Sequence, residues 1–387
     1  MEENKTSCGE NNLNQEVKKE TLNEEKIGLE VEETQKEQGN DNTESKENKQ
    51  TVENESPKQG YYYPYKQPVY IPKPTFEKEY FEKTAVKKTA NKIGLCLILF
   101  NLISLVLQVV VAGILSFLGK INYLSDPFFL LEFNIVLSLF GFLPVGAIIF
   151  MVEKGKNNLS FGLPKRKNFI SLILMGVGFF YAANVLIVML QSNLSFLGEL
   201  KGGEIALPTG VTGALMSVLA VAVAPALLEE FVFRGAILGG LLKYGKAFAI
   251  FTSALLFGLM HGNLVQIPFA FLAGLIIGFV VVETGSFWSG VIIHFINNLM
   301  SVGLDYLKNY LGDEKTNSLY MLLLVVLISI GLIGYFAYTI KNKDAFVLSK
   351  SQHLSTSYER VKWFISAGAM VIYIIIIAAQ VIILQIS

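Results

Sequence analysis

The chain has 387 residues, of which 52% are hydrophobic and 17% are charged, and its formal net charge is zero. This composition is too apolar for a soluble domain. The two cysteines, Cys8 and Cys96, also exclude a disulfide framework and a cysteine-based metal site. Long apolar runs recur from about Ile93 onward, each near the roughly 20 residues that cross a bilayer as a helix. We therefore expect an all-α, polytopic membrane helix bundle.

The first 60 residues differ from the rest of the chain. They contain 16 acidic and 8 basic residues and no aromatic residue. Such a segment cannot bury enough apolar surface to offset its chain entropy, so 1–60 is predicted to be a disordered acidic tail. Residues 61–92 are first rich in Pro and Tyr and then in Lys, and we interpret them as an extended cytoplasmic linker.

The apolar runs predict about eight or nine transmembrane helices, with the fourth longer than one span. Their expected ranges are 93–118, 129–152, 169–191, 207–242, 246–262, 266–282, 286–306, 319–340 and 363–386.

Basic residues in short connections indicate the orientation, because Lys and Arg favour the cytoplasmic side. They precede the first helix and recur in alternate connections, which predicts a multi-pass protein of the cell membrane with a cytoplasmic N-terminus. The residues concerned include Lys83, Lys87, Lys88, Lys154, Lys165, Lys243, Lys246, Lys341, Lys343 and Arg360.

Five candidate ionisable residues fall within one hundred-residue window of the apolar part of the chain, where charges are costly and usually functional. Glu230 and Arg234 are four residues apart and can pair on one helix face. Glu229 is rotated from Glu230 by about 100°, so it is free to face a cavity. His261 and His294 lie in the apolar stretches that follow.

These groups are expected at similar depth in the membrane. If Lys243–Lys246 forms a turn, Glu229 and His261 both lie about 20 Å from it. His294 lies nine residues beyond the next expected turn, at Gly285, and Asn298 shares its helix face.

Other interpretations of single residues stay open. A lone intramembrane histidine is commonly an interhelical hydrogen-bond partner, and a Glu pair with an Arg can be a structural network or a proton site. Asn298 and its neighbour Asn297 can be polar contacts between helices. The motifs H-E-x-x-H, G-x-S-G and G-x-G-D of other intramembrane proteases do not occur in the sequence.

The ordered motifs E-E-x-x-x-R (Glu229–Arg234), F-x-x-x-H (Phe257–His261) and H-x-x-x-N (His294–Asn298) resemble those of the CPBP family. This family of intramembrane proteases includes type II CAAX prenyl endopeptidases, Abi bacteriocin-immunity proteins and lysostaphin-resistance-protein-A-like proteins. The resemblance implies that 207–306 is the catalytic core. Residues 93–206 would then be accessory transmembrane helices, and 307–387 C-terminal ones.

The resemblance also implies roles for the motif residues. Glu229 would be the general base that activates a water, assisted by His261. His294 and Asn298 would stabilise the oxyanion, and Glu230, Arg234 and Phe257 would support the site. Zn²⁺ held by Glu229, His261 and His294 is a chemical alternative that the sequence does not decide. We expect no cofactor, since Asn298 is a natural oxyanion donor and a poor zinc ligand.

The expected partners are the lipid bilayer and a membrane-embedded or lipid-anchored protein or peptide substrate, with no nucleic acid. The sequence leaves the substrate and the oligomeric state open. Two other functions are alternatives: a non-catalytic bacteriocin-immunity or scaffold protein, and a proton-coupled transporter. The transporter would require repeat symmetry, which the sequence does not show.

Overall fold

A computed structural model describes residues 73–152, 168–194, 206–343 and 353–386, together with Gly162 and Phe346. These residues belong to the unit Val69–Ser387. All elements of the described part are helices, which confirms the all-α expectation. The predicted tail 1–60 and the linker up to residue 72 lie outside the described residues.

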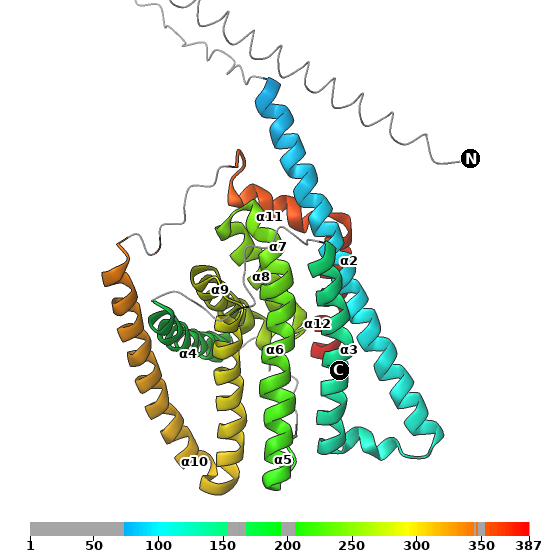
Figure 1. Ribbon diagram of the computed structural model, residues 1–387. Coiled ribbons are helices and arrows are strands. Elements are labelled where there is room, and N and C mark those ends of the chain that lie inside the picture. Colours follow the sequence, from blue (N-terminus) through cyan, green and yellow to red (C-terminus); the bar gives the residue numbers. More distant parts are fainter. Residues whose placement is uncertain are drawn as a thin grey trace, which may run out of the picture. The chain divides into compact units, whose positions relative to one another are not determined.

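The helices follow one another in the order that the apolar runs predict (Figure 1). The described elements are α2 (Lys73–Phe117), η1 (Ile121–Ser125), α3 (Pro127–Val152), α4 (Phe169–Leu194), the continuous helix Gly210–Tyr244, α8 (Lys246–Met260), α9 (Gln266–Thr284), α10 (Trp288–Lys341), α11 (Ser357–Ile365) and α12 (Gly368–Ile386).

The start of the first helix was predicted wrongly. Helix α2 begins at Lys73, so the part of the linker expected at 73–92 is helical. This part carries many lysines, but a buried apolar stripe begins within it and continues into the following turns of α2, which packs against α11 and α12. The tertiary contacts bury this stripe, which an analysis of uninterrupted apolar runs overlooks. The stripe consists of Val86, Ala90, Ile93 and Leu97.

Seven helices of the described part are long and apolar enough to cross a membrane. One of them, α10, folds back at Gly312, whose φ of 78° and ψ of 166° are not helical (Figure 1). Its two halves correspond to the predicted helices 286–306 and 319–340. Helix α8 has 15 residues and is about 22 Å long, shorter than the roughly 30 Å hydrocarbon core. Eight long segments and one short one thus agree with the expected eight or nine.

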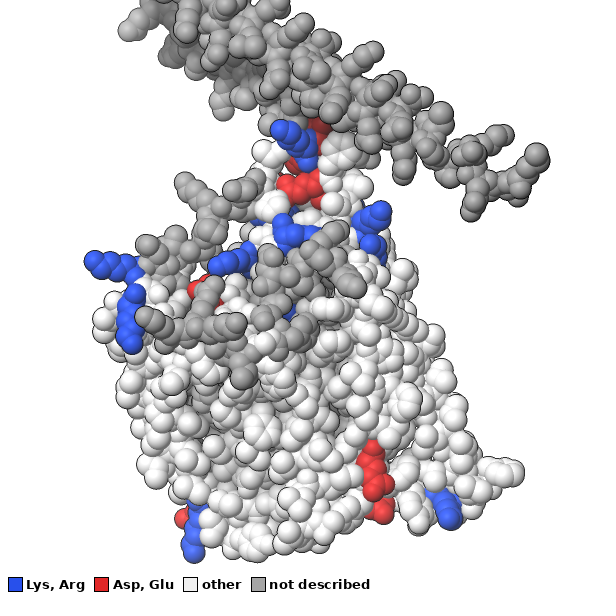
Figure 2. Space-filling model, viewed as in Figure 1, with Lys and Arg blue, Asp and Glu red and all other residues white. Residues whose placement is uncertain are grey.

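Charged side chains gather at the two ends of the bundle, and an uncharged band separates them (Figure 2). This is the surface of a multi-pass membrane protein. At the Lys-rich end, Lys246 Nζ at the start of α8 lies 3.4 Å from Glu283 Oε1 at the end of α9. Both ends of the α8–α9 hairpin therefore lie on one side of the band.

The Lys-rich end also fixes the long helix Gly210–Tyr244. The buried Arg360 of α11 donates to the carbonyl of Tyr244, and the Tyr244 hydroxyl donates to the carbonyl of Ala85 in α2 over 3.1 Å. Glu82 of α2 approaches both Arg360 Nε, at 3.9 Å, and His353 Nδ1, at 3.2 Å. The first and last described segments thus hold the end of this helix.

Helices α4 and α10 make the most extensive contact of the bundle, and glycines allow it. A Cβ added to Gly331 would lie 2.5 Å from Gly178 Cα, and one added to Gly334 would lie 2.5 Å from Met175 N. The backbones of the two helices therefore touch directly, as small residues permit in membrane bundles.

Two glycine substitutions in α10 are expected to act in opposite directions. Gly331→Ala forces α4 and α10 apart and should lower the free energy of unfolding by about 1–3 kcal/mol. Gly303 has open space around its Cβ position, so Gly303→Ala should raise it by about 0.5–1 kcal/mol through helix propensity. Denaturant unfolding in mixed micelles, followed by circular dichroism, measures both. Equal effects of the two variants would contradict the α4–α10 contact.

Candidate active site

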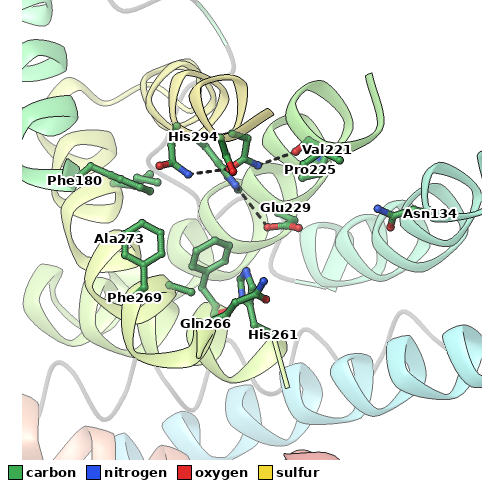
Figure 3. A pocket seen from close by; sticks show the side chains of 16 residues that line it. Asn134, Phe180, Val221, Pro225, Glu229, His261, Gln266, Phe269, Ala273 and His294 are labelled. Atoms are coloured by element: carbon green, nitrogen blue, oxygen red, sulfur yellow. Dashed lines mark hydrogen bonds and ion pairs between the residues drawn. The ribbon is translucent and has the colours of Figure 1, made fainter. Parts of the chain in front are cut away.

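The two adjacent glutamates face different surroundings, as the helix geometry predicts. They end helix α6 (Ala224–Glu230), a segment of the helix Gly210–Tyr244. The Glu230 side chain is fully buried, while the Glu229 side chain is 14% exposed and lines a cavity of about 360 Å³ (Figure 3). Only Glu229 can meet a molecule that enters this cavity.

Glu230 is the centre of a buried charge network. Its Oε1 atom accepts from Arg234 Nη1 over 2.7 Å and from His294 Nδ1 over 3.0 Å. The guanidinium of Arg234 also lies 4.3 Å from the ring centroid of Phe257, a cation–π contact. The network confirms the predicted Glu230–Arg234 pair and adds His294 to it.

Gly290 allows His294 to reach Glu230. The two α10 residues are four apart and share a helix face. A Cβ at position 290 would lie 2.5 Å from Glu230 Oε2, so a larger residue there would push α10 away from the carboxylate. The sequence motif begins at His294, and the glycine one turn earlier was overlooked.

His294 connects the two glutamates. Its Nδ1 atom donates to the carboxylate of Glu230, and its Nε2 atom lies 3.9 Å from Glu229 Oε2. This distance exceeds hydrogen-bond length, so Glu229 does not form a hydrogen bond with Nε2. The Nδ1 atom of the imidazole is therefore held by Glu230, and the Nε2 atom is available to the cavity.

His261 is fixed in the same way, through its Nδ1 atom. It follows directly on α8, and its Nδ1 atom lies 2.9 Å from the carbonyl oxygen of Phe257. A carbonyl only accepts, so Nδ1 carries the proton and Nε2 of the neutral ring presents a lone pair. The Phe257 ring contacts both histidine rings edge-on, with centroid distances of 5.1 Å to His261 and 5.8 Å to His294.

The turn after His261 lies at membrane depth, because the short α8 does not reach the far end of the bundle. Its backbone groups are bound by amide side chains, as the absence of water requires. Asn263 Nδ2 donates to the carbonyl of His261 over 3.1 Å, and Gln191 Nε2 of α4 donates to the carbonyl of Val265 over 2.7 Å. Asn263 Oδ1 accepts from the backbone N–H of Gln266 over 2.8 Å.

Asn298 is held by a carbonyl that a proline leaves available. Pro225 has no N–H with which to bond the carbonyl of Val221, four residues earlier. Asn298 Nδ2 donates to that carbonyl over 2.9 Å, and Asn298 Oδ1 accepts from Asn297 Nδ2 over 3.0 Å. These two bonds fix the orientation of the amide and leave one N–H of Asn298 for the cavity.

The structure thus brings Glu229, Phe257, His261, His294 and Asn298 to one cavity and places Glu230 and Arg234 behind it. The predicted common depth of Glu229 and His261 agrees with this arrangement. Sequence reasoning overlooked several polar residues that line or shape the cavity, although an amide in an apolar helix was a usable signal. These are Asn134, Gln191, Asn263 and Gln266.

The zinc alternative requires a ligand set of Glu229, His261 and His294. Within the described ranges, no three side chains of His, Cys, Asp or Glu are arranged so that they can hold a metal ion. Glu229, His261 and His294 line one cavity, and the Nδ1 atoms of the two histidines bind Phe257 or Glu230, so only their Nε2 atoms could hold a metal ion. We assign no reaction step to a metal ion.

Residues 211–300 match the family of type II CAAX prenyl endopeptidases described as Rce1-like. No curated protein and no solved structure matches the chain. The match covers all three motifs and confirms the resemblance to the CPBP intramembrane proteases. The chain is therefore a multi-pass membrane protein with an Rce1-like domain, a domain type of membrane endopeptidases.

Breaking the buried ion pair should destabilise the fold. Arg234→Met leaves the Glu230 carboxylate without its strongest partner and should cost about 3–5 kcal/mol, as for other buried pairs. The double variant Glu230→Gln with Arg234→Met removes both charges and should regain part of this loss. Thermal unfolding of wild type, of these two variants and of the single variant Glu230→Gln in detergent, arranged as a double-mutant cycle, gives the coupling. If the losses of stability in the two single variants add up in the double variant, the coupling between Glu230 and Arg234 is contradicted.

Proposed function

We propose that this protein is a glutamate-dependent intramembrane endopeptidase. The observation that carries the proposal is the convergence of Glu229, His261, His294 and Asn298 on one cavity within the matched segment. Amide hydrolysis needs a base that activates water and donors directed at the developing negative charge. The cavity offers both kinds of group.

In the proposed reaction, Glu229 takes a proton from a water while the water oxygen attacks the scissile carbonyl carbon. The lone pair on His261 Nε2 accepts a hydrogen bond from the same water and orients it. When the tetrahedral intermediate collapses, the C–N bond breaks and Glu229 returns the proton to the leaving nitrogen. Protons and charges then balance without a further reactant.

The oxyanion is proposed to bind the free N–H of Asn298 and the Nε2–H of His294. For His294 to donate from Nε2, the ring must be protonated, since Nδ1 already donates to Glu230. The imidazolium and Arg234 then balance the two carboxylates of Glu229 and Glu230. A neutral cluster is the least costly state for a site that is largely removed from water.

The proposed substrate is a membrane-embedded or lipid-anchored protein or peptide, because most residues that line the cavity belong to helices long and apolar enough to cross a membrane. We also propose that the Lys-rich end faces the cytoplasm, which would place the start of α2 on that side of the cell membrane.

The first test compares wild type with Glu229→Gln, both purified as full chains in detergent. Each is assayed against fluorogenic farnesylated CAAX peptides and bacteriocin-leader peptides. We expect Glu229→Gln to lower kcat by about 10²–10⁴-fold, the usual contribution of a general base, while thermal unfolding stays unchanged. Glu314→Gln, at an exposed carboxylate of α10 that does not line the cavity, is the matched control.

Cleavage by wild type and Glu314→Gln alone would support the proposal and identify the substrate class. Equal activity of Glu229→Gln would exclude Glu229 as the base. A folded wild-type protein that cleaves neither peptide set would instead favour the non-catalytic immunity or scaffold alternative.

Pro225→Ala tests how Asn298 is held. Alanine restores an N–H that can bond the carbonyl of Val221 and compete with Asn298 for it. We expect kcat to fall by about threefold to tenfold, the equivalent of one weakened hydrogen bond. The unfolding temperature should not fall, since alanine is the better helix former. Unchanged kcat would show that the Val221 contact does not position Asn298 for the reaction.

A further inference from the structure

Two amide side chains of the cavity wall have hydrogen-bonding groups that the described chain does not use. Asn134 lies in the apolar helix α3, outside the matched segment, and is partly buried. Its amide has no hydrogen-bond partner among the described residues. An amide at membrane depth that is left unpaired is costly, so a polar group entering the cavity is its natural partner.

Gln266 is the second amide, at the start of α9 and at the exposed rim of the cavity. Asn263 Nδ2 donates to its Oε1 atom over 2.9 Å, and Asn263 also binds its backbone N–H. These contacts fix the amide of Gln266. Its Nε2 donors have no acceptor among the described residues. The side chain lies beside His261 in Figure 3.

The two amides flank the group proposed as the base. In Figure 3, Glu229 lies between Asn134 on one side and His261 with Gln266 on the other. Much of the remaining wall is apolar and is formed by Phe180, Phe269, Ala270, Ala273 and Ile277. A molecule that spans the cavity past Glu229 therefore meets one amide on each side of it.

We propose that Asn134 and Gln266 bind the backbone of an extended peptide segment, on the two sides of the bond that Glu229 attacks. This inference rests on the proposed endopeptidase function. A helical substrate uses its backbone N–H and C=O groups internally, whereas an extended one presents them to both amides. A hydrocarbon chain offers no such group, so the two amides recognise the peptide part of the substrate and not its lipid.

The test replaces each amide by an isosteric apolar residue, Asn134→Leu and Gln266→Met. Asn193→Leu and Gln108→Met are matched controls at exposed amides of α4 and α2 that do not line the cavity. The substrate is whichever farnesylated or leader peptide the wild type cleaves. It is also prepared with single N-methyl or thioamide replacements at the residues flanking the cleaved bond.

We expect each cavity variant to raise KM by about threefold to tenfold, with kcat changed less, and the controls to behave as wild type. One N-methyl or thioamide replacement should lower wild-type kcat/KM by a similar factor. The same replacement should change kcat/KM less than twofold in the variant that lacks its partner, as a double-mutant cycle requires. A merely structural role of the amide would leave the penalty of the modified peptide unchanged.

If both cavity variants have the KM and kcat of wild type, the inference is overturned and the endopeptidase proposal stands. The same holds if the N-methyl and thioamide replacements lower kcat/KM in the cavity variants as much as in wild type. Loss of cleavage in Glu229→Gln alone separates these outcomes from failure of the proposed function. Absence of any cleavage by folded wild type would overturn both.

Discussion

The pairing of Arg234 with Glu230 inside an apolar bundle constrains the rest of the site. A buried charge without a partner is strongly unfavourable, so the elements around this pair must supply compensating groups. His294 from α10 donates to the same carboxylate oxygen, and the Phe257 ring from α8 covers the guanidinium. Three segments of the chain therefore converge on one ion pair. Glu229, next in sequence to the pair, is thereby left facing the cavity.

Backbone groups at membrane depth impose a second constraint on the same region. The turn between α8 and α9 and the carbonyl opposite Pro225 both need partners in a place without bulk water. Amide side chains supply them, Asn263 and Gln191 at the turn and Asn298 at Val221. The same bonds hold the backbone at His261 and the amide of Asn298 in place. Preorganised groups of this kind stabilise a developing charge without a reorganisation cost.

The matched segment does not form the cavity alone. Helix α4 contributes Phe180 to the wall and Gln191 to the turn, and α3 contributes Asn134. Helix α4 is itself fixed by its glycine contact with the second half of α10. The helices outside residues 211–300 therefore form part of the cavity wall.

The sequence by itself determined the helical class, the order of the membrane helices and the motif residues that reach the cavity. These depend on local properties, namely apolar runs about 20 residues long and polar groups at helical spacing. The tertiary structure alone decided that residues 73–92 are helical, that His294 binds Glu230, and that Asn298 binds the carbonyl of Val221. Each depends on contact between segments distant in sequence, where burial and the need to pair polar groups outweigh local preference.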